Sequence, residues 1–582
     1  MIDFRLYRAA WLPAVAAFVM VMFSLQGIPE PPDPHIAPAT FDGERAAATA
    51  VDILGAGPER RPGSDGAEAA ARLVLERFEG VPAGTAASQA FEMNVDGSQR
   101  ELQNVVLTLS GDSDEILLVV APRDTAPGGG AGAASSAAAT GALVELGEVL
   151  GSTEHAKTVV LVSTDAATEG AEGIRRFLDS FADRERIETA IVLSQPGFDE
   201  PRAPHVLRHA TDDTSTSIGL VRTAEEAIAE QAMRDPGDRG SLFSDLARLA
   251  LPVAYGEQSV LISEGIDAIA ISAAGEKPLA PSEDTEERLD PEVLAQFGAA
   301  ALAVVLLVDP LPRALEHGPE AYVELSGSLI PGWALGVLAL ALVLPAAVAA
   351  ADGIARAVRS DAGEVHAMAW AVGLAFPPLA SLAALHLLGV VGLLADPGHP
   401  FDPGLLSVGF AEALVMLVLL ASWSVAYVLT GLLRAPEDAF EDALVPAVGV
   451  VAVAGALGIW ALNPFLGLLV APLANVWLLA AREEPSRVLV VAGVAAAALP
   501  VLLALGSSLG AIGAGPWDLL LMIAGGQVPA LVTIAACLLA GAMVGLLVLA
   551  LRGRLDRPNP LGGGPQGDWG PAESLSASAS IN

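Results

Sequence analysis

The best candidates for metal chemistry in this sequence are two histidines followed closely by two aspartates. His205 and His209 lie four residues apart, and Asp212 and Asp213 follow within four more positions. On a helix this spacing places both imidazoles on one face, and imidazole and carboxylate groups are ligands that zinc accepts. The pattern makes His205, His209 and Asp213 a candidate zinc site. The alternative is that the two histidines are a half-exposed polar pair on a strand.

A second group of acidic residues follows an apolar run at Thr158–Val162. Asp165, Glu169 and Glu172 place three carboxylates within eight positions. They could bind a cation together. The alternative is that they cap the helix expected near 170–181 and offset the positive end of its dipole.

Parallel strands are expected to bring some of these acidic residues together. The β-branched runs Ile116–Val120 and Thr158–Val162 flank a segment near 137–150 in which leucines recur at helical spacing. This order of strand, helix and strand indicates a parallel sheet, and ligands bind such sheets at the carboxyl ends of their strands. Asp124 and Asp165 follow the two runs, so we expect both at one edge of the sheet.

The two strand ends belong to a longer set of matching motifs. Ala121-Pro122-Arg123-Asp124 corresponds to A-H-x-D, and the segment 164–170 corresponds to T-x-x-E-E-x-G, two motifs of the M28 family of zinc aminopeptidases. Other segments that resemble this family are Arg61-Pro62-Gly63-Ser64, Leu102–Val106, Leu261–Ile271, Glu283-Asp284-Thr285 and Leu289-Asp290. The resemblance covers about 41–308 and implies an α/β domain, a mixed sheet sandwiched by helices.

The same resemblance implies that the metal site of the family is missing. The family binds two zinc ions through two His, two Asp and one Glu, and a second Glu is the general base. The ligand positions carried over to this sequence hold Pro122, Ser135, Thr168, Ser194 and, approximately, Ala280, and the position of the base holds Ala167. Only Asp124 is retained, and in the family it orients the first His. These residues predict a pseudopeptidase without a metal cofactor; the alternative is an active zinc aminopeptidase with displaced ligands.

Composition indicates a membrane protein with a large soluble part. Of 582 residues 53% are hydrophobic and only 17% are charged, and the formal net charge is −37. Such an acidic chain is not expected to bind nucleic acid. The single cysteine, Cys537, excludes an intrachain disulfide and a C-x-x-C site. The chain is rich in Ala and Gly and contains more Arg than Lys, a composition typical of a bacterial protein.

Apolar runs of membrane-spanning length lie on both sides of the α/β domain. We expect an uncleaved anchor within 1–28, a proline-rich spacer at 29–40, a bundle of seven spans within 329–551 and a disordered tail at 553–582. The seven runs lie near 329–351, 367–395, 405–433, 443–462, 464–481, 488–508 and 519–551, and Gly525-Gly526 suggests a break in the last.

Basic residues predict how these spans cross the membrane. Arg5 and Arg8 precede the anchor, and arginines near 356–359, 434, 482–487 and 552–557 occupy alternate connections of the bundle. By the positive-inside rule both termini are cytoplasmic and the α/β domain is extracytoplasmic.

Within the spans, polar residues are the candidates for function. His386, Glu412 and Asn475 would line a binding groove or a proton-linked site, or they would form hydrogen bonds between helices. The overall architecture resembles M28 metallopeptidases of the endoplasmic reticulum and the attachment subunit of the glycosylphosphatidylinositol transamidase. This resemblance implies a scaffold that binds a protein or peptide partner outside the cytoplasm.

Overall fold

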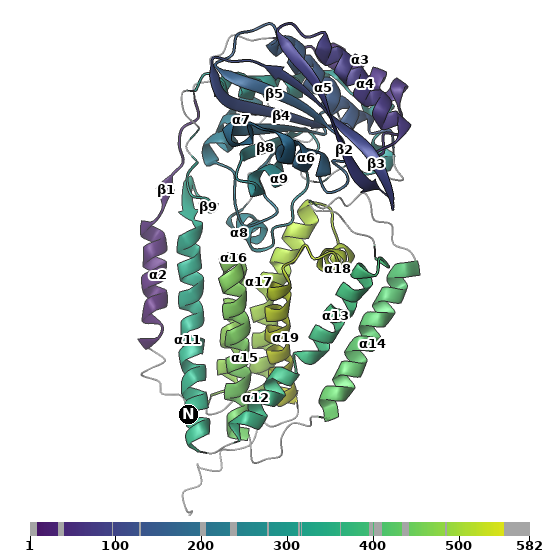
Figure 1. The fold of residues 1–582 in the computed structure, drawn as a ribbon. Helices are drawn as coiled ribbons and strands as arrows, with labels where there is room; N and C mark the ends of the chain where they lie inside the picture. The colour runs from purple at the N-terminus through teal and green to yellow at the C-terminus, as the bar shows by residue number, and fades with distance from the viewer. Residues whose placement is uncertain are drawn as a thin grey trace, which may run out of the picture.

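The structure is a computed structural model of the 582-residue chain. It describes residues 9–32, 40–95, 97–126, 130–197, 205–232, 241–275, 277, 279–311, 315, 317–360, 363–394, 400, 410–432, 441–482 and 486–551. An α/β domain lies at one end of a bundle of helices (Figure 1).

A seven-stranded mixed sheet forms the centre of the α/β domain. Its strands, in the order β2-β3-β5-β4-β6-β8-β7, are β2 (Gly84–Val95), β3 (Ser98–Leu109), β5 (Lys157–Thr164), β4 (Ser113–Pro122), β6 (Ile187–Ser194), β8 (Asp267–Ser272) and β7 (His205–Leu207). The four strands from β5 to β8 are parallel, and the edges are antiparallel. Because both faces of the parallel strands are covered, these strands are continuous apolar runs.

Helices cover both faces of this sheet, as the sequence predicts. One face packs against residues of α3 (Gly43–Ala56), α4 (Asp65–Glu79), α5 (Ala138–Leu150), α7 (Ile218–Ala232) and α10 (Pro291–Val308). The other face packs against α6 (Glu172–Ser180) and α9 (Gln258–Ser263). The predicted fold class is confirmed, and α10 belongs to the domain core although it is apolar enough to cross a membrane.

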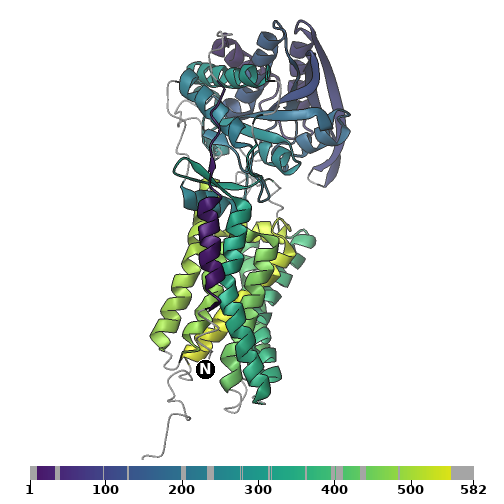
Figure 2. The ribbon, with the colours of Figure 1, turned by 90° about the vertical axis from the view of Figure 1, so that its left-hand side faces the viewer.

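A second, three-stranded sheet connects the domain to the membrane helices. We call β1 (Gln26–Gly27), β10 (Ser328–Pro331) and β9 (Tyr322–Leu325) the membrane-proximal sheet. The expected anchor is helical in α2 (Leu12–Phe23), which then continues into β1 and is shorter than the ~20 residues that usually span a bilayer. Figure 2 shows α2 beside α11 (Gly332–Arg359), which follows β10 directly. Residues 26–27 of the expected anchor and 329–331 of the first expected span are strands in the structure.

Apolar helices form the bundle. They are α11, α12 (Glu364–Gly373), α13 (Phe376–Val390), α14 (Phe410–Leu432), α15 (Glu441–Leu462), α16 (Pro464–Val476), α17 (Arg487–Ala511), α18 (Pro516–Ala524) and α19 (Ala530–Leu551). Within the described residues, six helical segments have the length and composition to cross a membrane, and five of them lie in the bundle. These helices indicate a multi-pass membrane protein. The predicted tail at 553–582 lies outside the described residues, as do 33–39 of the predicted spacer.

Two polar residues of the bundle hold segments together. Asn475 Nδ2 donates to the carbonyl oxygen of Leu342 on α11 at 3.0 Å, which is the interhelical role considered above. Asn463, at the start of α16, donates to the carbonyl oxygen of Leu249 at 2.9 Å and so joins the bundle to α8 (Leu242–Ala250) of the domain. The side chain of Glu412 lies outside the described residues, and His386 lies on α13 with a buried Nδ1.

A buried ion network joins the domain to the membrane-proximal sheet. Glu324 on β9 accepts hydrogen bonds from Arg208 after β7 and from Arg222 on α7. Arg208 also pairs with Asp245 on α8 at 3.1 Å, and the other oxygen of Asp245 accepts from the backbone N–H of Glu324. One carboxylate on β9 therefore holds two elements of the domain.

Candidate functional site

A pocket of about 110 Å³ lies at the carboxyl ends of the parallel strands. We call it the strand-end pocket. Its wall includes the end of β4 at Pro122, the end of β6 at Ser194, and the loop after β5 at Ala167 and Thr168. The arrangement agrees with the general location of ligand sites in parallel sheets.

The backbone at two of these strand ends adopts left-handed conformations. Ala166, two residues after β5, has φ 55°, and Gln195, directly after β6, has φ 48°. Such conformations cost about 1–3 kcal/mol each for residues with a side chain and persist where surrounding contacts fix them. The Gln195 side chain is fixed on both sides, since its amide donates to the Tyr255 hydroxyl at 3.2 Å and its oxygen accepts from Leu279 N at 3.1 Å.

Asp124 holds the loop that follows β5. Its Oδ1 accepts from the backbone N–H of Ala167 at 2.9 Å. Its Oδ2 accepts from the backbone N–H of Thr168 at 2.9 Å and from the Thr168 hydroxyl at 2.5 Å. Three donors thus occupy this carboxylate, which is almost fully buried.

Asp284 holds the opposite wall in the same way. Its Oδ1 accepts from the backbone N–H groups of Ala134 and Ser135 at 2.8 and 3.2 Å, and its Oδ2 accepts from the Ser135 hydroxyl. Burial raises the pKa of Asp284, and the bond from Ser135 opposes this shift. The Glu283-Asp284-Thr285 motif pointed to Asp284 but did not show which groups its carboxylate binds.

A buried arginine, Arg60, connects segments that border the strand-end pocket. Arg60 Nε donates to the carbonyl oxygen of Arg123 at 2.9 Å, and Nη1 donates to that of Gly57 at 3.1 Å. Its Nη2 reaches both the carbonyl oxygen of Gly132 and the Ser136 hydroxyl. Burial lowers the pKa of Arg60 to about 10, so it stays charged at neutral pH.

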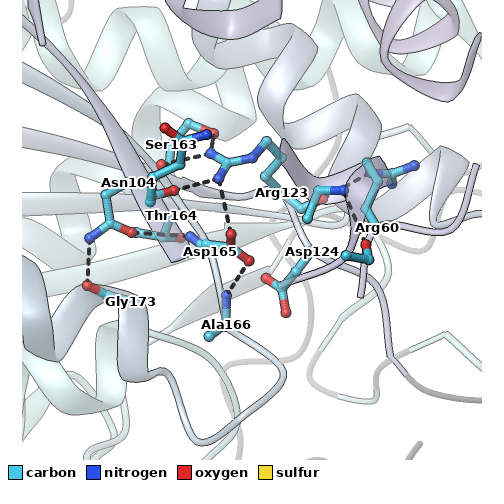
Figure 3. Close-up of polar contacts among 12 residues, drawn as sticks. Arg60, Asn104, Arg123, Asp124, Ser163, Thr164, Asp165, Ala166 and Gly173 are labelled. Atoms are coloured by element: carbon cyan, nitrogen blue, oxygen red, sulfur yellow. Dashed lines mark hydrogen bonds and ion pairs between the residues drawn. The ribbon is translucent and has the colours of Figure 1, made fainter. Parts of the chain in front are cut away.

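Arg123 and Asp165, which directly follow β4 and β5, form a buried ion pair at the carboxyl ends of these strands. Figure 3 shows Arg123 directed at Asp165, with a separation of 3.5 Å between Nη2 and Oδ2. Arg123 Nη1 also donates to Ser163, and Asn104 connects the backbone of Asp165 with that of Gly173. Burial raises the pKa of Asp165 to about 6, although Arg123 lowers it. Asp165 is therefore a structural partner of Arg123.

Glu257 is the acidic group of the pocket that lacks a hydrogen-bond donor. It is 2% exposed, and neither of its oxygens accepts a hydrogen bond of normal geometry from a described residue. Burial raises its pKa to about 8, an effect that the nearby Thr164 hydroxyl only partly opposes. The carboxyl group is thus mainly protonated at neutral pH. No sequence motif had singled it out.

The strand-end pocket faces the bundle. Its lining includes Tyr255 and also Pro400, from the connection between α13 and α14. Tyr255 also packs with Ile512 and Met522 at the end of the bundle. A ligand in this pocket would therefore lie between the domain and the membrane helices.

Comparison with known proteins supports an M28-like domain. Residues 104–305 match the family model of peptidase family M28. The domain is M28-like. No curated protein matches the chain.

Solved structures resemble about half of the chain. A glutaminyl cyclase from an Acidobacteriales bacterium is 16% identical, covers 47% of this chain and 97% of its own, and gives a TM-score of 0.39. A zinc aminopeptidase from Bacillus subtilis is 13% identical, with coverages of 46% and 95% and a TM-score of 0.39. A leucine aminopeptidase precursor from Bacteroides thetaiotaomicron is 15% identical, with coverages of 48% and 98% and a TM-score of 0.38.

The residues of the M28-like domain do not fit a zinc pair in the strand-end pocket. The carboxylates of Asp124 and Asp284 already accept hydrogen bonds from the loops around the pocket. Across the part of the chain that the structure describes, no group of three or more His, Cys, Asp and Glu could hold a metal ion. The positions that the family resemblance assigns to ligands lie at the pocket or beside it, with Ala280 exposed.

The candidate zinc site at His205, His209 and Asp213 gains no support from its surroundings. His205 lies on β7, and His209 forms an isolated bridge with Ser215, so the segment is extended rather than helical. Burial, followed by the charges of Arg248 and Arg208, lowers the pKa of His209 well below its usual value. Asp213 borders a different cavity, described below. Of the second acidic group, Glu172 forms an ion pair with Arg176 on α6.

Replacing Asp124 with alanine is expected to release the loop after β5. Loss of the acceptor leaves two backbone N–H groups and one hydroxyl without their partner, at a cost of about 2–4 kcal/mol. Hydrogen exchange should show the amides of Ala167 and Thr168 exchanging about tenfold faster or more. The control is Asp112→Ala, which changes an exposed residue directly before β4, at the opposite end of this strand from Asp124. It should not change these rates. Unchanged exchange in Asp124→Ala would contradict the assigned role.

Proposed function

We propose that this protein is a non-catalytic, membrane-embedded binding protein whose M28-like domain presents a ligand outside the cytoplasm. The observation that carries the proposal is the occupied state of the pocket's carboxylates. Asp124 and Asp284 accept three hydrogen bonds each from loops that surround the pocket, so they hold the walls of the pocket. Peptide hydrolysis by a zinc enzyme requires free metal ligands and a general base, and the described residues of this pocket do not supply that set.

The chemistry of the pocket favours a ligand with an amino group. Glu257 faces the pocket without a donor, and Asp124 adds negative charge nearby, since it contributes to the raised pKa of Glu257. An ammonium group would provide the missing donors and stabilise the ionised form of Glu257. The amino terminus of a peptide is the simplest ligand of this kind.

Orientation of the bundle supports a location outside the cytoplasm. Arg356 and Arg359 lie in the last turn of α11, at the end away from the domain, and Arg487 begins α17. The positive-inside rule places such ends in the cytoplasm. A ligand linked to the membrane could reach the strand-end pocket, because the lining residue Tyr255 also contacts the bundle.

Purified full-length protein is expected to contain far less than one zinc per chain. The reason is the lack of free ligands in the pocket. The zinc content is measured by elemental analysis after dialysis against micromolar zinc, and an aminopeptidase assay is run on the same sample. One or two zinc ions per chain with peptide hydrolysis would instead support the alternative, an active metallopeptidase with displaced ligands.

Peptide binding gives a direct test of the proposed ligand. Calorimetry at pH 7 with a trialanine peptide should detect binding accompanied by release of up to about one proton, read from two buffers of different ionisation enthalpy. An N-acetylated trialanine peptide is the matched control and should bind more weakly without proton release. Equal binding of both peptides would contradict an amine-specific pocket.

A further inference from the structure

A second cavity lies where the M28-like domain meets the bundle, and we call it the interface cavity. Its volume is about 220 Å³. The domain contributes 211–213 and 250–253, and the bundle contributes parts of α15, α16, α17, α18 and α19. It is separate from the strand-end pocket, with which it shares no lining residue.

Most of the wall on the bundle side is apolar. The apolar lining residues there are Leu462, Leu466, Leu505, Leu509, Leu519, Met522, Val528, Pro529 and Val532. Leu462 and Pro529 are exposed at the bundle surface, which faces lipid when the helices span a membrane. Water is a poor occupant of an apolar cavity. A hydrocarbon chain entering from the bilayer suits these walls.

One buried hydroxyl in this wall has no partner. Ser508 on α17 is 0% exposed, and its Oγ makes no hydrogen bond with a described residue, although its carbonyl oxygen accepts from Arg248. A buried polar group without a partner costs about 1–3 kcal/mol. A ligand with a polar atom at this depth, such as the ester oxygen of a lipid, would remove that cost.

The break between α18 and α19 borders the same cavity. The helix stops at Ala524 and resumes at Ala530, with Gly526 at φ 79° between them. Gln527, Val528 and Pro529 from this break are lining residues. Non-helical backbone at membrane depth is tolerated where it is enclosed by protein or lines a cavity.

Negative charge borders the cavity on the domain side. Asp212 and Asp213 are adjacent, and no Lys or Arg is among the described lining residues. Asp212 accepts from the backbone N–H of Thr214 at 3.0 Å, while Asp213 is half-buried. Burial, and then the charge of Asp212, raises the pKa of Asp213. A cationic group placed here would relieve this repulsion.

We propose that the interface cavity binds one bilayer lipid, with the first part of an acyl chain between α17 and α19 and an ammonium head group beside Asp212 and Asp213. The small volume suits part of a chain rather than a whole lipid. An anionic head group would meet two carboxylates and should be disfavoured. The bound lipid would contact the domain and the bundle together and so stabilise their junction.

Native mass spectrometry of the delipidated full-length protein tests this proposal. Titration with dioleoyl phosphatidylethanolamine should give one tightly bound lipid, with at least about fivefold preference over dioleoyl phosphatidylglycerol. Leu505→Trp fills the cavity and should weaken binding about tenfold or more. Leu502→Trp, three residues earlier on α17 and 61% exposed, is the matched control and should bind like the wild type. Asp213→Asn should reduce the head-group preference to less than about twofold.

Two results would overturn the proposal. One is a wild-type affinity for phosphatidylethanolamine in Leu505→Trp, and the other is equal affinity of the wild type for both lipids. If Leu505→Trp does not fold, photo-crosslinking of the wild type with a phosphatidylethanolamine that carries a diazirine in its acyl chain decides. Labelling should concentrate in peptides containing 505–509 and 527–532, and labelling spread evenly over the bundle would also overturn the proposal.

Discussion

Replacing Glu257 with glutamine should make the M28-like domain markedly less sensitive to pH between 5 and 8. Glutamine has the shape of the protonated carboxyl group but cannot ionise. In the wild type the pKa of Glu257 is raised by burial to about 8, against 4.5 for an ordinary Glu. Below pH 4.5 both the folded and unfolded states hold the proton. Above it the unfolded state releases the proton first, so stability falls as the pH rises towards 8.

The expected difference is large enough to measure. Between pH 5 and pH 8 the Glu257 contribution to the free energy of unfolding should fall by on the order of 3 kcal/mol, and the Gln variant should lack this part of the decline. Hydrogen exchange on domain peptides, recorded at several pH values and corrected for intrinsic rates, reports it. The control is Glu264→Gln at the end of the same helix α9, where the side chain is 41% exposed and pairs with Arg184. Parallel pH profiles for the wild type and Glu257→Gln would show that the pKa of Glu257 is not raised.

Replacing Glu324 with glutamine should loosen the junction between the domain and the membrane-proximal sheet. The change leaves the side chains of Arg208 and Arg222 without their shared carboxylate, and both are nearly buried. Removing one partner of a buried ion pair typically costs about 3–5 kcal/mol when the remaining charge is left unpaired. In Glu324→Gln the expected cost is smaller, because Arg208 keeps its pair with Asp245 and Arg222 keeps its pair with Glu225. Faster hydrogen exchange in β9, β10 and α8 is the expected result.

A neighbouring glutamate provides the control for this experiment. Glu320→Gln, four residues earlier and exposed, also removes one negative charge and should leave the exchange of β9 and α8 unchanged. If Glu324→Gln behaves like this control, the ion network does not hold the domain to the membrane-proximal sheet.

The sequence predicted the α/β domain well because its elements have strong patterns. Parallel strands such as β4 and β5 are continuous apolar runs, and α5 repeats leucine at helical spacing, so hydrophobic periodicity located them. The membrane-proximal sheet was missed because strands of two to four residues are too short to show alternation. Its pairing also depends on residues about 300 positions apart.

The site was predictable in position but not in its chemistry. Strand order placed Asp124 and Asp165 at one edge, and the structure agrees. It could not show that Asp124 binds the loop after β5, since those donors are backbone N–H groups that every residue carries. Glu257 was missed for a related reason: its raised pKa comes from burial, and an isolated Glu before a short helix gives no signal of burial. The histidine spacing places both imidazoles on one face only if the segment is helical, and the structure shows it extended, as in the alternative considered for this pair.

The pairing of β1 with β10 also has a consequence for the order of events during synthesis. Gln26 and Gly27 leave the ribosome about 300 residues before their partners Ser328 and Leu329. At 5–20 residues per second this interval lasts roughly 15–60 s. During this interval α2 lacks α11, against which it finally packs, and β1 lacks its partner β10. We therefore expect the M28-like domain to fold before the contacts of β1 with β10 and of α2 with α11 exist. The membrane-proximal sheet should form only after α11 has been synthesised.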